Sequence, residues 1–347
     1  MKELFFFGRF PAYKEVGGVT TFTYNFSHRF NSDKLTVIDF YPATGKKVPE
    51  NVRVKYILGN AIMRFFRILR FSTVNEGVYF FNFSSVKSLL FLFVLPKRSC
   101  SRWFAIFHNG EQGKKYESCN FITKFIIRKT IKKFDAVGAL SLPQKVFLKK
   151  IECEEIVRVT PYVAYDRLKS NCENRLSKSV IPKIIISGFP TKIYRLIETI
   201  SILSRLENEG IQFELNLCLY GLDNDGIKEK ILHDAEKLNI VKIYSHLDGE
   251  EFSNLLSQMD IYIRLNSVDS FGLVVAEAIE AQVLVITTDV CERYPGANLV
   301  KVDDFETVFK ELCFILKNKR TSGLMRIQKS AAAVVEYDEL LSKLQSL

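Results

Sequence analysis

Short apolar runs rich in β-branched residues alternate with longer amphipathic stretches along most of this chain. In the second half the strand-like runs are KIIISGF, FELNLCLYG, VKIYSH, DIYIRLN and VLVITTD. The stretches at 194–210, 227–239 and 250–259 lie between them and have the length and pattern of helices. Strands that alternate with helices of this length predict a parallel sheet with helices on both faces.

The first half of the chain shows the same alternation. Its strand-like runs are ELFFFG, LTVIDFY, RWFAIFHNG and AVGALS, and TTFTYNFSHRF has helical character. A chain of 347 residues is long enough for two domains, each with its own core. We therefore predict an α/β protein of two doubly wound, Rossmann-like domains that face one another, with ligands at the carboxyl ends of the strands.

Charge is divided unevenly between the two halves. The net charge of the chain is +10, but residues 1–170 carry +16 and residues 171–347 carry −6. This asymmetry predicts a domain boundary near residue 170, and the polar stretch at 165–179 is the predicted linker. We expect an N-terminal domain at 1–168 and a C-terminal domain at 180–325.

A strongly basic half indicates a nucleic acid, an anionic membrane surface or anionic small ligands as partner. NAIMRFFRILRF and FITKFIIRKTIKKF place basic residues beside large apolar ones, a pattern typical of helices at a membrane surface. Ordinary surface helices packed on their own core would show the same pattern. A nucleic-acid partner is not expected, because the chain has no recognised reading motif and its second half is acidic.

Cysteine and histidine usage argues against disulfides and metal sites. The seven cysteines are scattered, which favours a reducing compartment. The four histidines show no metal-ligand spacing. No apolar run reaches membrane-spanning length, and the N-terminus does not resemble a signal peptide. We expect a soluble or peripheral protein.

Adjacent glycines follow the first predicted strand. Gly17 and Gly18 precede a helical stretch, so their backbone N–H groups could approach an anion at the helix N-terminus. A simple turn is the alternative, since neither of the common phosphate-binding fingerprints is present.

The most specific stretch is VDSFGLVVAEAIEAQVLVITTD, at 268–289. After the strand DIYIRLN, a helix is predicted to begin near Phe271 or Gly272 and to end at about Ala281. The free N–H groups of Phe271, Gly272 and Leu273 would then point at a ligand, with the positive end of the helix dipole behind them.

Two carboxylates frame this predicted helix. Asp269 lies just before it and Glu277 lies about one and a half turns into it, so they would contact different parts of one ligand. Both accept hydrogen bonds from hydroxyls, which suits a polyol. The alternative is a capping role for Asp269 and a surface position for Glu277, although the small apolar neighbours of Glu277 argue against exposure.

These segments resemble the family 4 retaining, nucleotide-sugar-dependent glycosyltransferases of GT-B fold, in particular those of bacterial O-antigen and capsule assembly. The resemblance rests on EVGGVTTFTYNFSHRF, FHNGEQGK, IIISGFPTKIYRLIETISIL, DSFGLVVAEAIEAQVLVITTDV and DVCERYPGANLVKVDD. It covers most of the chain in order. It also implies that a C-terminal helix at about 326–347 crosses back onto the first domain.

The resemblance implies a role for each matching residue. Glu277 would bind the ribose hydroxyls of the nucleotide and Asp269 the hydroxyls of the donor sugar. His108 would lie near the reacting sugar. The backbone at Phe271, Gly272 and Leu273 would lie beside the sugar and diphosphate, and Gly17 and Gly18 would face the diphosphate from the other domain.

The chain also departs from the family pattern. The position of Asp269 is often Glu, and Gly188 is followed by Phe189 where an Arg is common. We expect Lys192, or else Arg195, to neutralise the leaving diphosphate in place of that Arg.

The activity implied is retaining transfer of a hexose or N-acetylhexosamine from a nucleotide sugar, with UDP preferred over GDP. The acceptor implied is a polyprenyl-diphosphate-linked glycan, with no metal or other cofactor required. The protein would be cytoplasmic and peripheral at the inner face of the cytoplasmic membrane. Alternatives are a protein that binds a nucleotide sugar without transferring it, and a sugar-nucleotide epimerase.

Overall fold

A computed structural model describes residues 2–12, 17–30, 32–108, 112–162, 181–318, 337 and 339–344. The contacts divide the chain into two compact units. Unit 1 is Met1–Ala164 with Ala331–Leu347, and unit 2 is Tyr165–Ser330. The predicted linker at 165–179 and the residues 326–336 of the predicted C-terminal helix lie outside the described residues.

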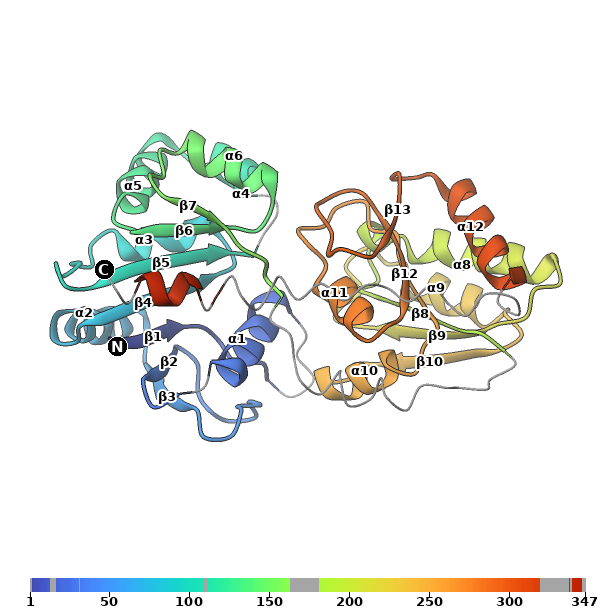
Figure 1. Ribbon diagram of the computed structural model, residues 1–347, viewed down its shortest axis with the longest axis horizontal. Coiled ribbons are helices and arrows are strands. Elements are labelled where there is room, and N and C mark those ends of the chain that lie inside the picture. The colour runs from blue at the N-terminus through green and yellow to red at the C-terminus, as the bar shows by residue number, and fades with distance from the viewer. Residues whose placement is uncertain are drawn as a thin grey trace. The chain divides into compact units, whose positions relative to one another are not determined.

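Unit 1 is built on a seven-stranded sheet in which every pair of strands is parallel. The strand order is β3-β2-β1-β4-β5-β6-β7. The strands are β1 (Glu3–Phe7), β2 (Leu35–Asp39), β3 (Arg53–Tyr56), β4 (Gly77–Phe83), β5 (Arg102–Phe107), β6 (Ala136–Ala139) and β7 (Ile156–Arg158). Figure 1 shows this sheet with helices on both faces.

Successive aromatic side chains of β1 and β4 point to opposite faces of this sheet and so build two cores. Phe5 and Tyr79 belong to one core, whereas Phe6 and Phe80 belong to the other. The first core is covered by helices that follow β3, β4, β5 and β6. They are α2 (Ala61–Val74), η1 (Val86–Ser88), α3 (Leu89–Leu92), α4 (Gln112–Glu117), α5 (Phe121–Ile131) and α6 (Leu142–Lys150).

The second core of unit 1 is covered by α1 (Gly18–Arg29) and by the C-terminal residues 337 and 339–344, which are helical. Tyr337 is fully buried in this core beside Phe22 and Phe26 of α1. Its hydroxyl donates a hydrogen bond to the carbonyl of Thr160 at 2.5 Å. The end of the chain is thus part of unit 1 (Figure 1).

Unit 2 contains a second parallel sheet, of six strands in the order β10-β9-β8-β11-β12-β13. Its strands are β8 (Lys183–Gly188), β9 (Glu214–Leu219), β10 (Val241–Ser245), β11 (Ile261–Arg264), β12 (Leu284–Thr288) and β13 (Asn298–Val300). Its helices are η2 (Lys192–Tyr194), α8 (Leu196–Asn208), α9 (Lys228–Ala235), α10 (Gly249–Leu256), α11 (Leu273–Glu280) and α12 (Phe305–Asn318).

One large core holds α8, α9 and α12 against the sheet of unit 2. Leu203 of α8 and Leu312 of α12 are fully buried there, together with Ile186 of β8. The contacts of α11 are with β11 and β12.

The predicted fold class is confirmed, since both sheets are parallel and doubly wound. In each sheet the strand order reverses direction beside the first strand, between β1 and β4 in unit 1 and between β8 and β11 in unit 2. Loops at such reversals diverge to opposite faces and leave room for a ligand at the carboxyl ends of the strands. The loops after β8 and β11 therefore define the place to look for a site in unit 2.

Candidate functional site

The loop after β11 leads into α11 through a glycine in a left-handed conformation. Gly272 has φ of +79° and precedes Leu273, the first residue of α11. Within the described part of the chain, the backbone N–H groups of Phe271, Gly272 and Leu273 form no hydrogen bond. The start of the helix agrees with the prediction, and its free N–H groups create a region of positive potential.

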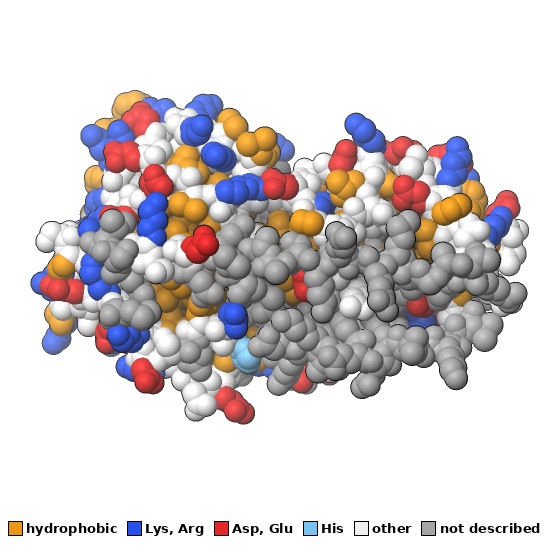
Figure 2. Space-filling view, viewed as in Figure 1, with side chains coloured by type: hydrophobic (Ala, Val, Ile, Leu, Met, Phe, Trp, Pro, Cys, Tyr) orange, Lys and Arg blue, Asp and Glu red, His pale blue; other side chains and the backbone are white. Residues whose placement is uncertain are grey.

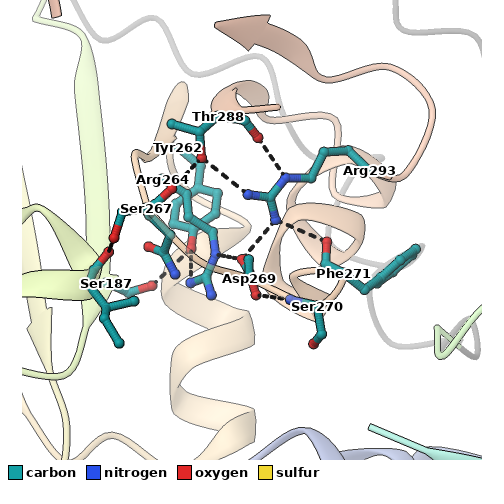
Figure 3. Close-up of polar contacts among 11 residues, drawn as sticks. Ser187, Tyr262, Arg264, Ser267, Asp269, Ser270, Phe271, Thr288 and Arg293 are labelled. Atoms are coloured by element: carbon teal, nitrogen blue, oxygen red, sulfur yellow. Dashed lines mark hydrogen bonds and ion pairs between the residues drawn. The ribbon is translucent and has the colours of Figure 1, made fainter. Parts of the chain in front are cut away.

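Asp269 lies between two arginines before this helix (Figure 3). Its Oδ2 accepts hydrogen bonds from Arg264 Nε and from Arg293 Nη1, both at 2.7 Å. Its Oδ1 accepts a hydrogen bond from the backbone N–H of Ser270 at 3.0 Å. Burial alone would raise the pKa of Asp269, but Arg264 and then Arg293 outweigh this effect and hold the pKa well below its usual range.

These contacts engage both carboxylate oxygens of Asp269 within the protein. Asp269 does not cap α11, because the N-cap is Gly272 and has no side-chain partner. A role in binding sugar hydroxyls stays a prediction, and a sugar would have to share Asp269 with its two arginines.

Arg293 connects the end of β12 to the loop before α11. Its Nε donates to the carbonyl of Thr288 at 3.0 Å, and its Nη1 donates to the carbonyl of Phe271 at 3.1 Å as well as to Asp269. The side chain is only 1% exposed. Neither arginine was predicted as a site residue from the sequence. Arg264 had a detectable signal, as the one charge in the apolar run IYIRL, whereas nothing in the sequence marked Arg293.

Glu277 differs sharply from Asp269 although both are on the same segment. It is half-buried on α11 and forms no hydrogen bond or ion pair with the residues that the structure describes. Burial raises its pKa to about 7. Glu277 also lies close enough to Tyr220, at the end of β9, to add to the rise in the pKa of that tyrosine, which is mainly due to burial. Its carboxylate is therefore a free hydrogen-bond acceptor in a weakly solvated place.

The loop after β8 places the two predicted cations differently. Lys192 is exposed at the start of η2, and its ammonium group contacts no partner among the described residues. Arg195 is ion-paired through Nη1 to Glu198 at 2.9 Å and through Nη2 to Asp303 at 2.8 Å. Of the two, Lys192 has the charge that is available to a ligand.

Contacts between the two loops place η2 beside the approach to α11. The backbone N–H of Ser267 donates to the carbonyl of Ile193 at 2.9 Å. Gly188, the last residue of β8, has a structural reason to be glycine, since a Cβ there would lie 2.3 Å from the ring of Tyr194. Unit 2 therefore brings Gly188, Lys192, Asp269, Gly272 and Glu277 to the carboxyl edge of one sheet.

In unit 1 the predicted histidine belongs to a buried network. His108 follows β5, and its Nε2 lies 2.6 Å from Oδ1 of Asn82 on β4. The amide nitrogen of Asn82 donates to the carbonyl of Val19 and to the hydroxyl of Thr23, so Oδ1 must accept and Nε2 must carry the proton. Burial lowers the pKa of His108 to about 3. His108 is therefore neutral, and Nδ1 remains as an acceptor.

The predicted glycine pair begins α1, next to this network. Gly17 is the N-cap, in an extended conformation open to any residue, and Gly18 is the first helical residue. The backbone conformation of Gly17 therefore does not require glycine. Among the described residues, the N–H groups of Gly18, Val19 and Thr20 have no hydrogen-bond partner. Asn82, which links this helix to His108, was not predicted as a site residue.

Metal ligands do not gather in the part of the chain that the structure describes, where no group of three or more His, Cys, Asp or Glu side chains could hold an ion. The six cysteines in the same ranges are all free.

Comparison with known families gives one match. Residues 191–297, which contain η2, the Asp269 cluster and α11, match the family described as glycosyl transferases group 1. No curated protein matches the sequence. The match supports the predicted glycosyltransferase class for the chain.

Solved structures of glycosyltransferases resemble the whole chain. Anabaena HepE in complex with UDP aligns with a TM-score of 0.76 at 13% identity and covers 100% of both chains. The UDP-forming α,α-trehalose-phosphate synthase of Burkholderia xenovorans aligns with 0.68 at 12% identity, over 99% of this chain and 100% of that one. The lipopolysaccharide outer core galactosyltransferase WaaB aligns with 0.64 at 12% identity, over 98% and 99%. At such identities the likeness shows the GT-B type of fold.

Replacement of Gly272 by alanine should destabilise unit 2. A Cβ there would lie 2.6 Å from Arg293 Nη1 and 3.2 Å from Asp269 Oδ2, at a backbone φ of +79°. We expect Gly272→Ala to lower stability by at least about 1–2 kcal/mol, the usual penalty of a left-handed conformation without glycine. Gly249→Ala is the matched control, because a Cβ there meets no atom within 4 Å. Equal denaturant midpoints for the two variants would contradict this explanation.

Replacement of Glu277 by glutamine should stabilise the protein in a pH-dependent way. Because the folded-state pKa is raised to about 7, the wild type loses stability from this group as the pH rises from about 4.5 to 7. Glutamine cannot ionise, so the gain in melting temperature should be small at pH 5 and larger at pH 8. The exposed Glu236→Gln should show no such trend. A gain independent of pH would exclude the raised pKa.

Proposed function

We propose that this glycosyltransferase binds a nucleotide sugar, preferably a UDP-sugar, at the carboxyl edge of the unit 2 sheet. The observation that carries the proposal is the carboxylate of Glu277, which has no partner among the described residues, on the same helix whose first N–H groups also have none there. A carboxylate acceptor suits the ribose hydroxyls, and a helix N-terminus suits the diphosphate. The UDP complex of HepE, a protein of the same fold, supports the choice of base.

In the proposed reaction a hexosyl or N-acetylhexosaminyl group moves from the nucleotide to an acceptor with retention of configuration. The bond between sugar C1 and the diphosphate oxygen breaks, and the diphosphate leaves with the electron pair. The N–H groups of Phe271, Gly272 and Leu273 and the ammonium of Lys192 would stabilise this negative charge without a metal. The acceptor oxygen then bonds to C1 from the same face, and its proton passes to the diphosphate oxygen that has just left.

His108 has a defined part in this proposal. Asn82 holds its Nε2 as a donor, so Nδ1 would accept a hydrogen bond from a hydroxyl of the transferring sugar. Because His108 is neutral well below pH 7, it would position the sugar rather than act as an acid. The carbohydrate acceptor proposed is a polyprenyl-diphosphate-linked glycan of O-antigen or capsule assembly.

A nucleotide-sugar-binding protein without transfer is the second candidate. It is favoured by one observation, the engagement of both Asp269 oxygens by Arg264, Arg293 and Ser270. Transfer measured with a nucleotide sugar and a lipid-linked acceptor, followed by NMR of the anomeric proton of the product, separates the two. Binding without turnover would favour the second candidate.

Nucleotide binding can be measured by thermal shift with UDP, GDP and ADP. We expect UDP to raise the melting temperature in proportion to the logarithm of its concentration, as for any ligand of the native state. Glu277→Ala should lower the affinity for UDP at least about tenfold, the scale of a lost hydrogen bond to a charged group. Glu236→Ala, an exposed charge change, should leave the shift intact. If no nucleotide shifts the melting temperature, the proposal of a donor site in unit 2 is wrong.

We also propose peripheral contact with an anionic membrane at the inner face of the cytoplasmic membrane. No described helix of the protein is both long enough and apolar enough to span a bilayer. The first turn of α5 exposes Phe121 (82%) and Ile122, and Lys129, two turns further along the same helix, is exposed as well. Figure 2 shows lysine and arginine side chains among hydrophobic ones over the part of unit 1 that carries α5 and α6. Such a combination suits partial insertion beside anionic headgroups.

Liposome flotation tests this contact. We expect the protein to float with vesicles of anionic lipid and not with neutral ones, and high salt should weaken the association. Phe121→Ser combined with Ile122→Ser should reduce flotation several-fold, because the exposed apolar side chains would no longer insert. Phe314→Ser, which removes an exposed apolar residue of unit 2, is the control. Equal flotation with both lipid types would refute the proposal.

A further inference from the structure

Three cations gather around one exposed tyrosine at the carboxyl edge of the unit 1 sheet. Tyr41 follows β2 and is 43% exposed. The guanidinium carbon of Arg9, after β1, lies 4.5 Å from its ring centroid, and that of Arg64, on α2, lies 5.6 Å away. The ammonium of Lys46 lies 5.5 Å from the same centroid. Three segments distant in sequence, the loops after β1 and β2 and the first turn of α2, thus meet at one point.

A buried aspartate organises this cluster. Asp39, the last residue of β2, is fully buried and ion-paired to Lys46. Its carboxylate also accepts hydrogen bonds from the backbone N–H groups of Phe10 at 3.1 Å and of Tyr41 at 2.9 Å. Asp39 therefore fixes the ends of β1 and β2 and holds Lys46 in place, so the cations have a preformed arrangement.

Arg64 is the cation whose surroundings indicate that this cluster could bind an anion. It is half-buried, and its side chain forms no hydrogen bond or ion pair within the described residues. Its Nε is buried and has no partner there. A buried guanidinium N–H without an acceptor is unfavourable, and like charges that converge on one ring repel each other. An anion with several oxygens would accept a hydrogen bond from Arg64 Nε and would offset the repulsion between the cations.

We propose that Arg9 and Arg64, which both contact the ring of Tyr41, bind the phosphate groups of the acceptor substrate, while Lys46 stays paired with Asp39. The inference rests on the proposed transferase function and assigns the acceptor a phosphate-bearing class. Two sources share this chemistry: a lipid-linked diphosphate and a soluble sugar phosphate. The polyprenyl-diphosphate-linked acceptor proposed above makes the lipid-linked source the expected one.

Calorimetric titration of the full chain tests the proposal, with geranyl diphosphate and glucose 6-phosphate as the two probes. Saturating UDP is present so that the donor site is occupied. We expect geranyl diphosphate to bind more tightly than glucose 6-phosphate. Arg64→Gln should weaken it about tenfold or more, the scale of one lost charge-assisted contact. Arg9→Gln should act in the same direction.

Arg70→Gln is the matched control, because it removes an exposed arginine from the same helix. It should change the affinity less than about twofold. Equal losses for Arg64→Gln and Arg70→Gln, or no binding of either probe by the wild type, would overturn the site. Tighter, Arg64-dependent binding of glucose 6-phosphate would overturn the lipid-linked source. The thermal shift by UDP should be unchanged in Arg64→Gln, so loss of the donor site is detected separately.

Discussion

The ion-pair cluster around Asp269 determines the shape of the segment on which the donor site depends. Asp269 and the carbonyl of Phe271 both receive hydrogen bonds from Arg293, so the loop is held at two points on either side of Ser270. This arrangement leaves no room for a Cβ at residue 272. The left-handed glycine then turns the chain into α11, whose first N–H groups form no hydrogen bond within the described part of the chain. A buried carboxylate with two cations thus sets the direction of a helix N-terminus.

In unit 1 the start of a helix is positioned by a neutral side chain, Asn82, instead of an ion pair. Asn82 lies at the end of β4, one of the two strands at which the order of its sheet reverses. Its amide reaches α1 through Val19 and Thr23, and its carbonyl oxygen reaches His108. One buried side chain therefore fixes a helix start and the tautomer of a histidine together. Because every polar atom of Asn82 has a partner, the network is stable although it is buried.

Much of the fold could be predicted from local patterns, whereas the contacts that shape the site could not. DIYIRLN predicted β11, and the glycine before LVVAEAIE predicted the start of α11 almost to the residue. β4 was not predicted, although its run GVYFFNF is as continuously apolar as those of β1 and β5, the pattern of a parallel strand buried on both faces. Arg293 reaches Asp269 across 24 positions, and its approach depends on the path of the chain after β12. Such pairings are consequences of tertiary packing, which a local pattern does not encode.

Asp269 and Glu277 show how strongly packing separates two similar side chains. They are eight positions apart, and although the apolar neighbours of Glu277 argued against exposure, no local pattern indicated that the two carboxyls would differ in pKa. The arginines hold the pKa of Asp269 low and engage its oxygens, while burial without a partner raises the pKa of Glu277 to about 7. Asp269 contributes to the structure of the loop in the free protein. In the free protein, the ionised form of Glu277 is unfavourable because the carboxylate is buried without a hydrogen-bond donor among the described residues. A ligand that donates hydrogen bonds to this carboxylate would offset that cost.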